Sequence, residues 1–344
     1  MQERVIELCA EIISKASVVG KKESEGPLGK HFDLFDVSDR FGAKTWEAAE
    51  SEMQRRALNT ALAKIRLKDS DLGALFAGDL LNQCVGSAYG LMDFDVPYFG
   101  LYGACSTCAE GLLLASVLVS HGNYPRTAAV TSSHYCSAER QYRLPIEYGG
   151  QRAPGAQWTV TGSGAFLLQR AEGISCGAVI RRAMPGKVRE RGINDANNMG
   201  AAMAPAAEDT LVRYFTATET HPRDYDLIVT GDLGFEGGSI LCDLMRADGY
   251  PISDCYSDCG MMIFDREGQD VHGGGSGCGC SAVVLAAHLL PLLERGELSK
   301  ILFLSTGAMM SPDSIKQGQN IPAVAHLLEI HSPSVASNGK TKEE

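Results

Sequence analysis

Three segments of the chain place apolar residues three and four positions apart, which is the spacing of a helix with a buried face. They are residues 46–64, about 108–120 and about 280–293. The last two are strongly apolar, follow small residues, and end at Gly122 and Gly296, as helices commonly do. We therefore predict three long helices, two of them strongly apolar.

Short apolar runs bounded by glycine and polar residues predict strands between these helices. Residues 15–45 are rich in glycine, lysine and proline at their centre and are predicted as a long loop. The predicted strands are residues 73–77, 96–101, 127–131, 227–230, 261–264 and 300–304, and a further short strand follows the glycine turn 162–164 within residues 159–168.

The second half of the chain repeats the pattern of the first. A Gly-Asp-Leu turn follows a strand at residues 78–80 and again at 231–233. Both halves then share one order of features: a small-residue turn, an apolar helix, a glycine, a basic residue and a strand. The corresponding positions are separated by a constant number of residues. Such a duplication predicts an α/β fold of two βαβ halves packed as a layered α-β-α-β-α sandwich. We place the halves at residues 1–170 and 171–331, with a disordered tail at 332–344.

The net charge and the cysteine content limit the classes of function that this chain could have. The net charge of −11 and the lack of a basic stripe argue against a nucleic-acid partner. No secretory signal and no run of about 18 apolar residues is present, which favours a cytoplasmic protein. Eleven cysteines, an odd number, are then best read as reduced thiols.

Cys105 is the residue with the clearest chemical potential. It lies between an apolar strand and a long helix, where backbone N–H groups and the helix dipole lower the pKa of a thiol. The same N–H groups can hold a carboxylate or an oxyanion. The alternative is a small residue that fits a tight turn, and sequence position alone leaves both open.

Several motifs resemble those of a known superfamily. The turn at 103–107 resembles the nucleophile turn of thiolases and ketoacyl synthases, and residues 160–165 and 273–282 resemble their glycine turns. A closer resemblance, over about residues 20–326, is to the stage V sporulation protein AD family. It rests on residues 26–29, 77–83, 103–107, 132–134, 138–141, 147–151, 203–207 and 274–278.

This resemblance implies a thiolase-like fold and a role in endospore formation. The ligand it implies is dipicolinic acid (pyridine-2,6-dicarboxylate), which the family loads into the developing spore together with membrane proteins of the same operon. It also implies a homodimer, associated peripherally with the cytoplasmic side of the spore inner membrane.

The sequence departs from the enzymes of the superfamily at the positions of their catalytic partners. These enzymes need a base and a group that polarises a thioester carbonyl. Asp232 stands near one such position, residues 274–277 contain no His or Asn, and Ser305 to Gly307 replaces the second thiolase cysteine. We therefore expect a non-catalytic binding protein. The alternatives are an acyl-CoA condensing enzyme or thiolase that uses Cys105, with His272 as a substitute base, and an assembly protein that docks membrane partners.

A dicarboxylate calls for hydrogen-bond donors and cationic side chains around a flat slot. We expect no cofactor and no bound metal, apart from calcium that could travel with the ligand. A zinc site at Cys105 and Cys108 is a weaker alternative. The expected ligand-binding residues are Cys105, Ser106, His134, Arg140, Ser276, Gly277 and Thr306. For His134 and Arg140 the alternatives are a structural loop histidine and an ion pair with Glu139 or Glu147.

Overall fold

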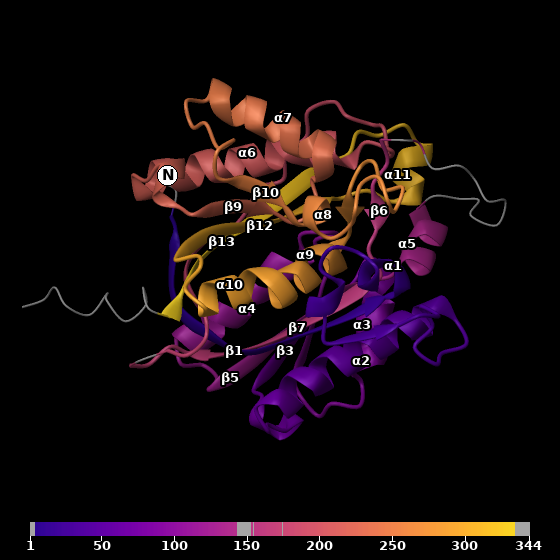
Figure 1. Cartoon of the computed structure of the whole chain (residues 1–344), viewed down its shortest axis with the longest axis vertical. Coiled ribbons are helices and arrows are strands. Elements are labelled where there is room, and N and C mark those ends of the chain that lie inside the picture. Colours follow the sequence, from indigo (N-terminus) through magenta and orange to yellow (C-terminus); the bar gives the residue numbers. More distant parts are fainter. Residues whose placement is uncertain (1–3, 143–152, 154, 174, 334–344) are drawn as a thin grey trace, which may run out of the picture.

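The computed structural model describes residues 4–142, 153, 155–173 and 175–333. Figure 1 shows a layered α/β molecule in which two sheet regions enclose a layer of helices. The first region has the order β4-β3-β5-β7-β1 and the second the order β10-β9-β12-β13-β8. Antiparallel pairing between β1 and β8 joins them into one path.

The strands of the first region are β1 (Ile6–Gly20), β3 (Ala74–Gly78), β4 (Tyr98–Leu101), β5 (Arg126–Ser133) and β7 (Gly162–Arg170). Those of the second are β8 (Val179–Met184), β9 (Leu227–Thr230), β10 (Tyr256–Asp258), β12 (Lys300–Ala308) and β13 (Ala323–His331). β2 (Leu34–Asp36) pairs with β1, while β6 (Trp158–Thr159) and β11 (Gly275–Ser276) form a separate two-stranded sheet.

Helices form the other three layers. α4 and α9 lie between the two sheet regions and contact strands of both. α2 and α3 cover the outer face of the first region, and α6, with α7 packed beside it, covers the second. These helices are α2 (Trp46–Lys64), α3 (Val85–Leu91), α4 (Thr107–Ser120), α6 (Met199–Thr218), α7 (Gly234–Ala247) and α9 (Cys278–Val284). A π-helical turn (Leu285–Leu289) continues α9 into α10 (Leu290–Glu294). The short helices are α1 (Lys21–Ser24), α5 (Tyr135–Tyr142), α8 (Cys259–Met262) and α11 (Pro312–Lys316).

Burial explains why the two inner helices are apolar almost all round. A helix sandwiched between two sheets has no face left for water, so its apolar residues are not confined to one stripe. Leu112, Ala115 and Val119 of α4 and Val283 of α9 are fully buried in one cluster that fills the middle layer. The predicted layered α/β architecture is confirmed.

Two predicted segments were wrong. The loop predicted for residues 15–45 begins too early, because β1 runs to Gly20. Glu11, Ser14 and Ser17 are buried in this strand, so its sequence lacks the simple alternation that marks a half-buried strand. Residues 261–264 were predicted as a strand, but the first two of them belong to helix α8. The Asp258 side chain caps this helix by accepting the N–H of Gly260.

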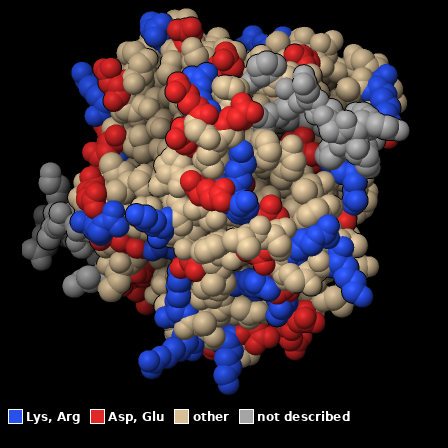
Figure 2. All heavy atoms as spheres, turned by 45° about the vertical axis from the view of Figure 1, so that its right-hand side comes forward, with Lys and Arg blue, Asp and Glu red and all other residues tan. Residues whose placement is uncertain are grey.

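The proposed division at residue 170 falls in the connection between β7 and β8. The predicted tail lies outside the described residues from position 334 onward. On the face shown in Figure 2, Lys and Arg residues are interspersed with Asp and Glu rather than gathered into a stripe. No described helix is long and apolar enough to cross a membrane.

Candidate functional site

Cys105 lies in a tight turn between β4 and α4. Ala104 adopts a left-handed conformation with φ of 50°, which is unusual for a residue with a side chain. Hydrogen bonds from side chains help to hold the turn. The N–H of Gly103 donates to Thr107 Oγ1 (3.0 Å), and Ser106 Oγ donates to the carbonyl of Gly103 (2.6 Å). The turn places Cys105 at the start of α4 with 6% of its surface exposed.

The partner of the Cys105 thiol is Asp232, from the turn after β9. This buried carboxylate lies next to the thiol and raises its pKa. Asp232 Oδ1 also accepts from Thr306 Oγ1 (2.8 Å), and its Oδ2 accepts from the N–H of Gly277 (2.9 Å) and from Ser276 Oγ (3.3 Å). Segments from both halves thus converge on one carboxylate.

Gly277 makes this convergence possible. Its φ of 102° lies in a region that residues with side chains rarely adopt, and an added Cβ would lie 2.6 Å from Ser133 Oγ. A residue with a side chain would therefore displace the N–H that Asp232 accepts.

The site does not activate the thiol. Burial raises the pKa of Cys105 well above its ordinary value, and the Asp232 carboxylate raises it further. The N–H of Gly277 and the Ser276 hydroxyl lower the pKa but do not offset these two effects. The expectation that the helix start lowers the pKa of Cys105 is therefore wrong in this environment.

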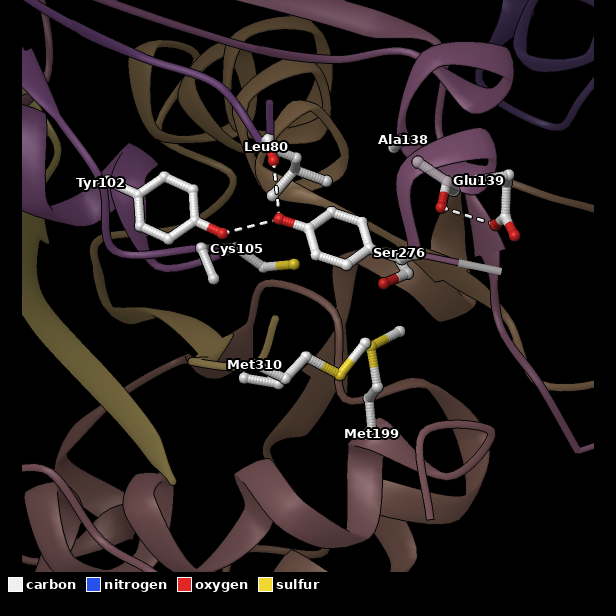
Figure 3. Close-up of a pocket in the computed structure, with 12 residues that line it drawn as sticks. Leu80, Tyr102, Cys105, Ala138, Glu139, Met199, Ser276 and Met310 are labelled. Atoms are coloured by element: carbon white, nitrogen blue, oxygen red, sulfur yellow. Dashed lines mark hydrogen bonds between the residues drawn. The ribbon is translucent and has the colours of Figure 1, made fainter. Parts of the chain in front are cut away.

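A pocket opens above the thiol. Figure 3 shows Tyr102 and Leu80 on one side of it, Met199 and Met310 on the other, and Cys105 and Ser276 between. No Lys, Arg or His is among the described residues that line it. The lining consists of Leu80, Tyr102, Ala104, Cys105, Ala138, Glu139, Tyr142, Thr159, Met199, Ser276, Ala308 and Met310.

Hydrogen bonds fix the polar groups on two sides of the pocket. Tyr142 donates its OH to the carbonyl of Leu80 (2.7 Å), so its oxygen accepts from the OH of Tyr102 (2.7 Å). Burial raises the pKa of both tyrosines, which therefore stay neutral. At another side, Thr159 Oγ1 donates to Glu139 Oε1 (2.8 Å).

Five of the seven predicted ligand-binding residues gather here. Cys105 and Ser276 line the pocket, and Gly277 and Thr306 hold Asp232 beneath it. Ser106 is fully buried and its hydroxyl is used within the turn.

His134 and Arg140 lie elsewhere, which corrects the expectation that they line the same pocket. The ring of His134 is buried, with Nδ1 accepting the N–H of Cys136 (3.1 Å) and Nε2 donating to the carbonyl of Asp39 (2.8 Å). Burial lowers the pKa of His134, so the ring is neutral and structural. Arg140 forms an ion pair with Glu47.

His272, considered as a substitute base, lies outside the pocket. Its side chain is 52% exposed and pairs with Asp270. Among the described residues, no group of three or more His, Cys, Asp and Glu side chains is arranged to hold a metal ion.

The sequence analysis did not identify the two tyrosines and two methionines that line the pocket. Tyr102 follows the predicted strand at 96–101, and Met310 follows the one at 300–304, so the ends of strands offered a signal for these two. Tyr142 and Met199 come from helices that carried no signal of a site. Glu139 stands beside Arg140 in a motif quoted above, where the neighbouring residue was preferred.

A second buried carboxyl group lies behind the site. Glu50 of α2 accepts the hydroxyls of Ser132 (2.9 Å) and Ser137 (2.7 Å). Burial raises the pKa of Glu50 to about 8, and the nearby Asp79 carboxylate adds to the effect. Asp79 itself caps its turn, accepting the N–H of Leu81 (2.8 Å). The two Gly-Asp-Leu turns therefore use their aspartates differently.

Solved structures with the same fold include two proteins of Xanthomonas. The cerulenin-bound OleA of Xanthomonas campestris matches with a TM-score of 0.58 at 15% identity, covering 94% of this chain and 96% of that chain. The 3-oxoacyl-(acyl carrier protein) synthase III of Xanthomonas oryzae pv. oryzae matches with a TM-score of 0.60 at 14% identity, covering 95% of this chain and 100% of that chain. At such identities the likeness shows the thiolase-like fold.

Sequence comparison decides the family. The family model for stage V sporulation protein AD matches residues 2–331. The chain belongs to the stage V sporulation protein AD family. One member, stage V sporulation protein AD of Bacillus subtilis (strain 168), is 44% identical over 313 residues, which cover 91% of each chain. Family membership confirms the resemblance seen in the sequence, and in this member of the family the thiolase-like fold carries Asp232 beside Cys105.

Proposed function

We propose that this chain is a non-catalytic sporulation protein that binds dipicolinic acid in the pocket above Cys105. The observation that carries the non-catalytic part is the Cys105–Asp232 contact. A base that activates a thiol must be able to take its proton and leave a favourable ion pair. Transfer of the proton to Asp232 would leave the thiolate beside a neutral carboxylic acid, with no ion pair to stabilise it. Loss of the proton to water would leave two negative charges side by side, so the thiol stays protonated.

The negative charge of dipicolinic acid is the main constraint on the proposal that it binds in this pocket. Glu139 lines the pocket and Asp232 lies under it, while no basic residue is among the described lining residues. A free dianion would be repelled there unless its charge is compensated. Calcium chelated by the two carboxylates and the ring nitrogen would neutralise it, so we propose that calcium enters together with the ligand.

Titration calorimetry with dipicolinic acid, with and without calcium, tests this function. We expect saturable binding that is stronger with calcium. Ser276→Ala removes one hydroxyl from the pocket and should weaken binding, whereas Arg140→Ala, on the outer surface, should not. Absence of heat and of any thermal shift under both conditions would exclude the proposal.

A second candidate is an acyl-CoA condensing enzyme or thiolase, because Cys105 occupies the turn before the inner helix. It predicts a covalent acyl group on Cys105 after incubation with an acyl-CoA. Intact-protein mass spectrometry would reveal it as a mass increase absent from Cys105→Ala. We expect no such increase.

For the cellular role we propose that the protein acts as a homodimer with membrane proteins of the same operon, at the cytoplasmic side of the spore inner membrane. Co-purification from sporulating cells tests the partnership. Pocket variants that lose ligand but keep their partners would separate binding from assembly. If every pocket variant binds ligand normally and only partner contacts matter, docking is the main role.

A further inference from the structure

The loop between α1 and α2 carries apolar side chains that the described part of the chain leaves in water. β2 lies in this loop and, among the described strands, pairs with β1 alone. Leu34 is 41% exposed, Phe35 59% and Val37 67%. Successive side chains of a strand point to opposite faces, so both faces of β2 present apolar groups to solvent. We call Leu34, Phe35 and Val37 the apolar tip.

Hydrogen bonds and an ion pair fix the loop on both sides of the apolar tip. Before the tip, Asp33 accepts the N–H of Ser17 (2.9 Å) and forms an ion pair with Lys64 (2.6 Å). After the tip, Asp39 accepts the N–H of Lys21 (2.7 Å). The loop therefore holds its apolar side chains outward instead of folding them onto the core. Grouped apolar side chains that are held in water commonly mark a surface that contacts a partner or a membrane.

The charges around the apolar tip favour an anionic surface. Two aspartates of the loop are engaged as described above, and Asp36 accepts the N–H of Ser38 (2.7 Å). Lys30 and Lys44 stand on either side of the tip along the chain, and their exposed side chains form no hydrogen bond or ion pair with the described residues. The formal charges of residues 30–44 cancel, whereas the whole chain carries −11. An anionic surface is therefore repelled less by this loop than by the rest of the protein.

We propose that the apolar tip inserts into the surface of a lipid bilayer that contains anionic lipids, with Lys30 and Lys44 at the headgroups. This inference rests on the membrane location proposed above and does not depend on the ligand. A bilayer surface fits the loop because it offers apolar depth below the tip and anionic groups beside the two lysines. The open backbone edge of β2 stays in the hydrated headgroup region, since unpaired N–H and C=O groups are costly in the hydrocarbon core. The contact is therefore shallow and reversible.

The test is co-sedimentation of the full chain with vesicles of phosphatidylcholine, prepared with or without phosphatidylglycerol. The tip variant combines Phe35→Ser and Val37→Ser. Val188→Ser is its matched control, because Val188 is 62% exposed but lies in the segment after β8. We expect the wild type to bind the vesicles that contain phosphatidylglycerol. The tip variant should lower the partition coefficient at least tenfold, roughly the loss expected when these side chains no longer leave water, and the control should not change it.

A second variant separates charge from apolar contact. It combines Lys30→Gln and Lys44→Gln, and Lys68→Gln, at an exposed lysine before β3, is its control. Binding to vesicles that contain phosphatidylglycerol should fall about fivefold for each lysine removed, while binding to phosphatidylcholine alone stays unchanged. Circular dichroism should show that every variant is folded.

Failure of the wild type to sediment with either kind of vesicle overturns the proposal, and so does equal binding by the tip variant. If light scattering shows that the tip variant turns a dimer into a monomer, the tip is a contact between copies and the proposal is wrong. If the tip variant keeps its vesicle binding but loses membrane proteins on co-purification, the tip contacts a protein instead. Calorimetry with dipicolinic acid reports separately on the ligand, so the two proposals can fail independently.

Discussion

Replacing Asp232 by asparagine should make Cys105 reactive. Asparagine keeps the shape of the side chain but removes the negative charge beside the thiol. Its single oxygen can accept the N–H of Gly277, and its NH2 group then faces Thr306 Oγ1, which accepts instead of donating. The buried thiol would then retain the N–H of Gly277 and the start of α4, both of which favour the thiolate.

The size of the effect follows from the repulsion between the Cys105 thiolate and the neighbouring Asp232 carboxylate. Two unit charges about 4 Å apart interact by roughly 4 kcal/mol at an effective dielectric of about 20. This corresponds to a fall of about three units in the pKa of Cys105. The thiolate fraction would rise about a thousandfold, and because a less basic thiolate is a weaker nucleophile, the rate should rise about thirtyfold.

The assay is the rate at which a small disulfide reagent modifies Cys105 between pH 6 and 10, localised by tandem mass spectrometry because the chain has 11 cysteines. Asp95→Asn, at an exposed carboxylate, is the control for a general change in charge. A pH profile of Asp232→Asn that coincides with that of the wild type would refute the idea that Asp232 holds the thiol protonated. Circular dichroism should first show that the variant is folded.

Three further results are expected. Burial raises the pKa of Glu50 and of Glu23 to about 8, so the folded state keeps protons that the unfolded chain releases above about pH 4.5. Urea unfolding between pH 6.5 and 8 should therefore show stability falling by about 1 kcal/mol per pH unit for each group, and a flat profile would contradict this. Glu50→Gln should make that slope shallower, whereas an unchanged slope would assign the titration to other groups. Gly277→Ala should lower the melting temperature and abolish ligand binding, because its Cβ meets Ser133, and normal binding would show that the segment can shift. Leu112→Ala, in the middle layer, should cost about 2–5 kcal/mol in chemical unfolding without altering the pH dependence.

Local patterns in the sequence were enough to predict the layered fold and part of the candidate site. The helix at 46–64 was predicted with its observed bounds, because α2 covers one sheet face and keeps a regular apolar period. The strand at 227–230 and the Cys105 turn were also found, since both are bounded by glycine turns.

Long-range packing decided what the sequence did not reveal. His134 follows β5 as expected, but its orientation depends on the loop that carries Asp39, which packs over it from nearly a hundred residues away along the chain. In the sequence, Asp232 was noted only because it stands near a position where the enzymes of the superfamily carry a histidine. Its contact with Cys105 requires the turn after β9 in one half to meet the turn before α4 in the other.

The β1–β8 pairing has a consequence for how a ligand reaches the site. Proteins that bind ligands between two lobes often open by hinge rotation of one lobe against the other. Here main-chain hydrogen bonds cross the boundary between the halves, and both sheet regions pack on the same inner helices. A hinge motion would break that ladder and uncover the middle layer. The proposed ligand would therefore enter by small displacements near Tyr102, which is 39% exposed, and not by separation of the two halves.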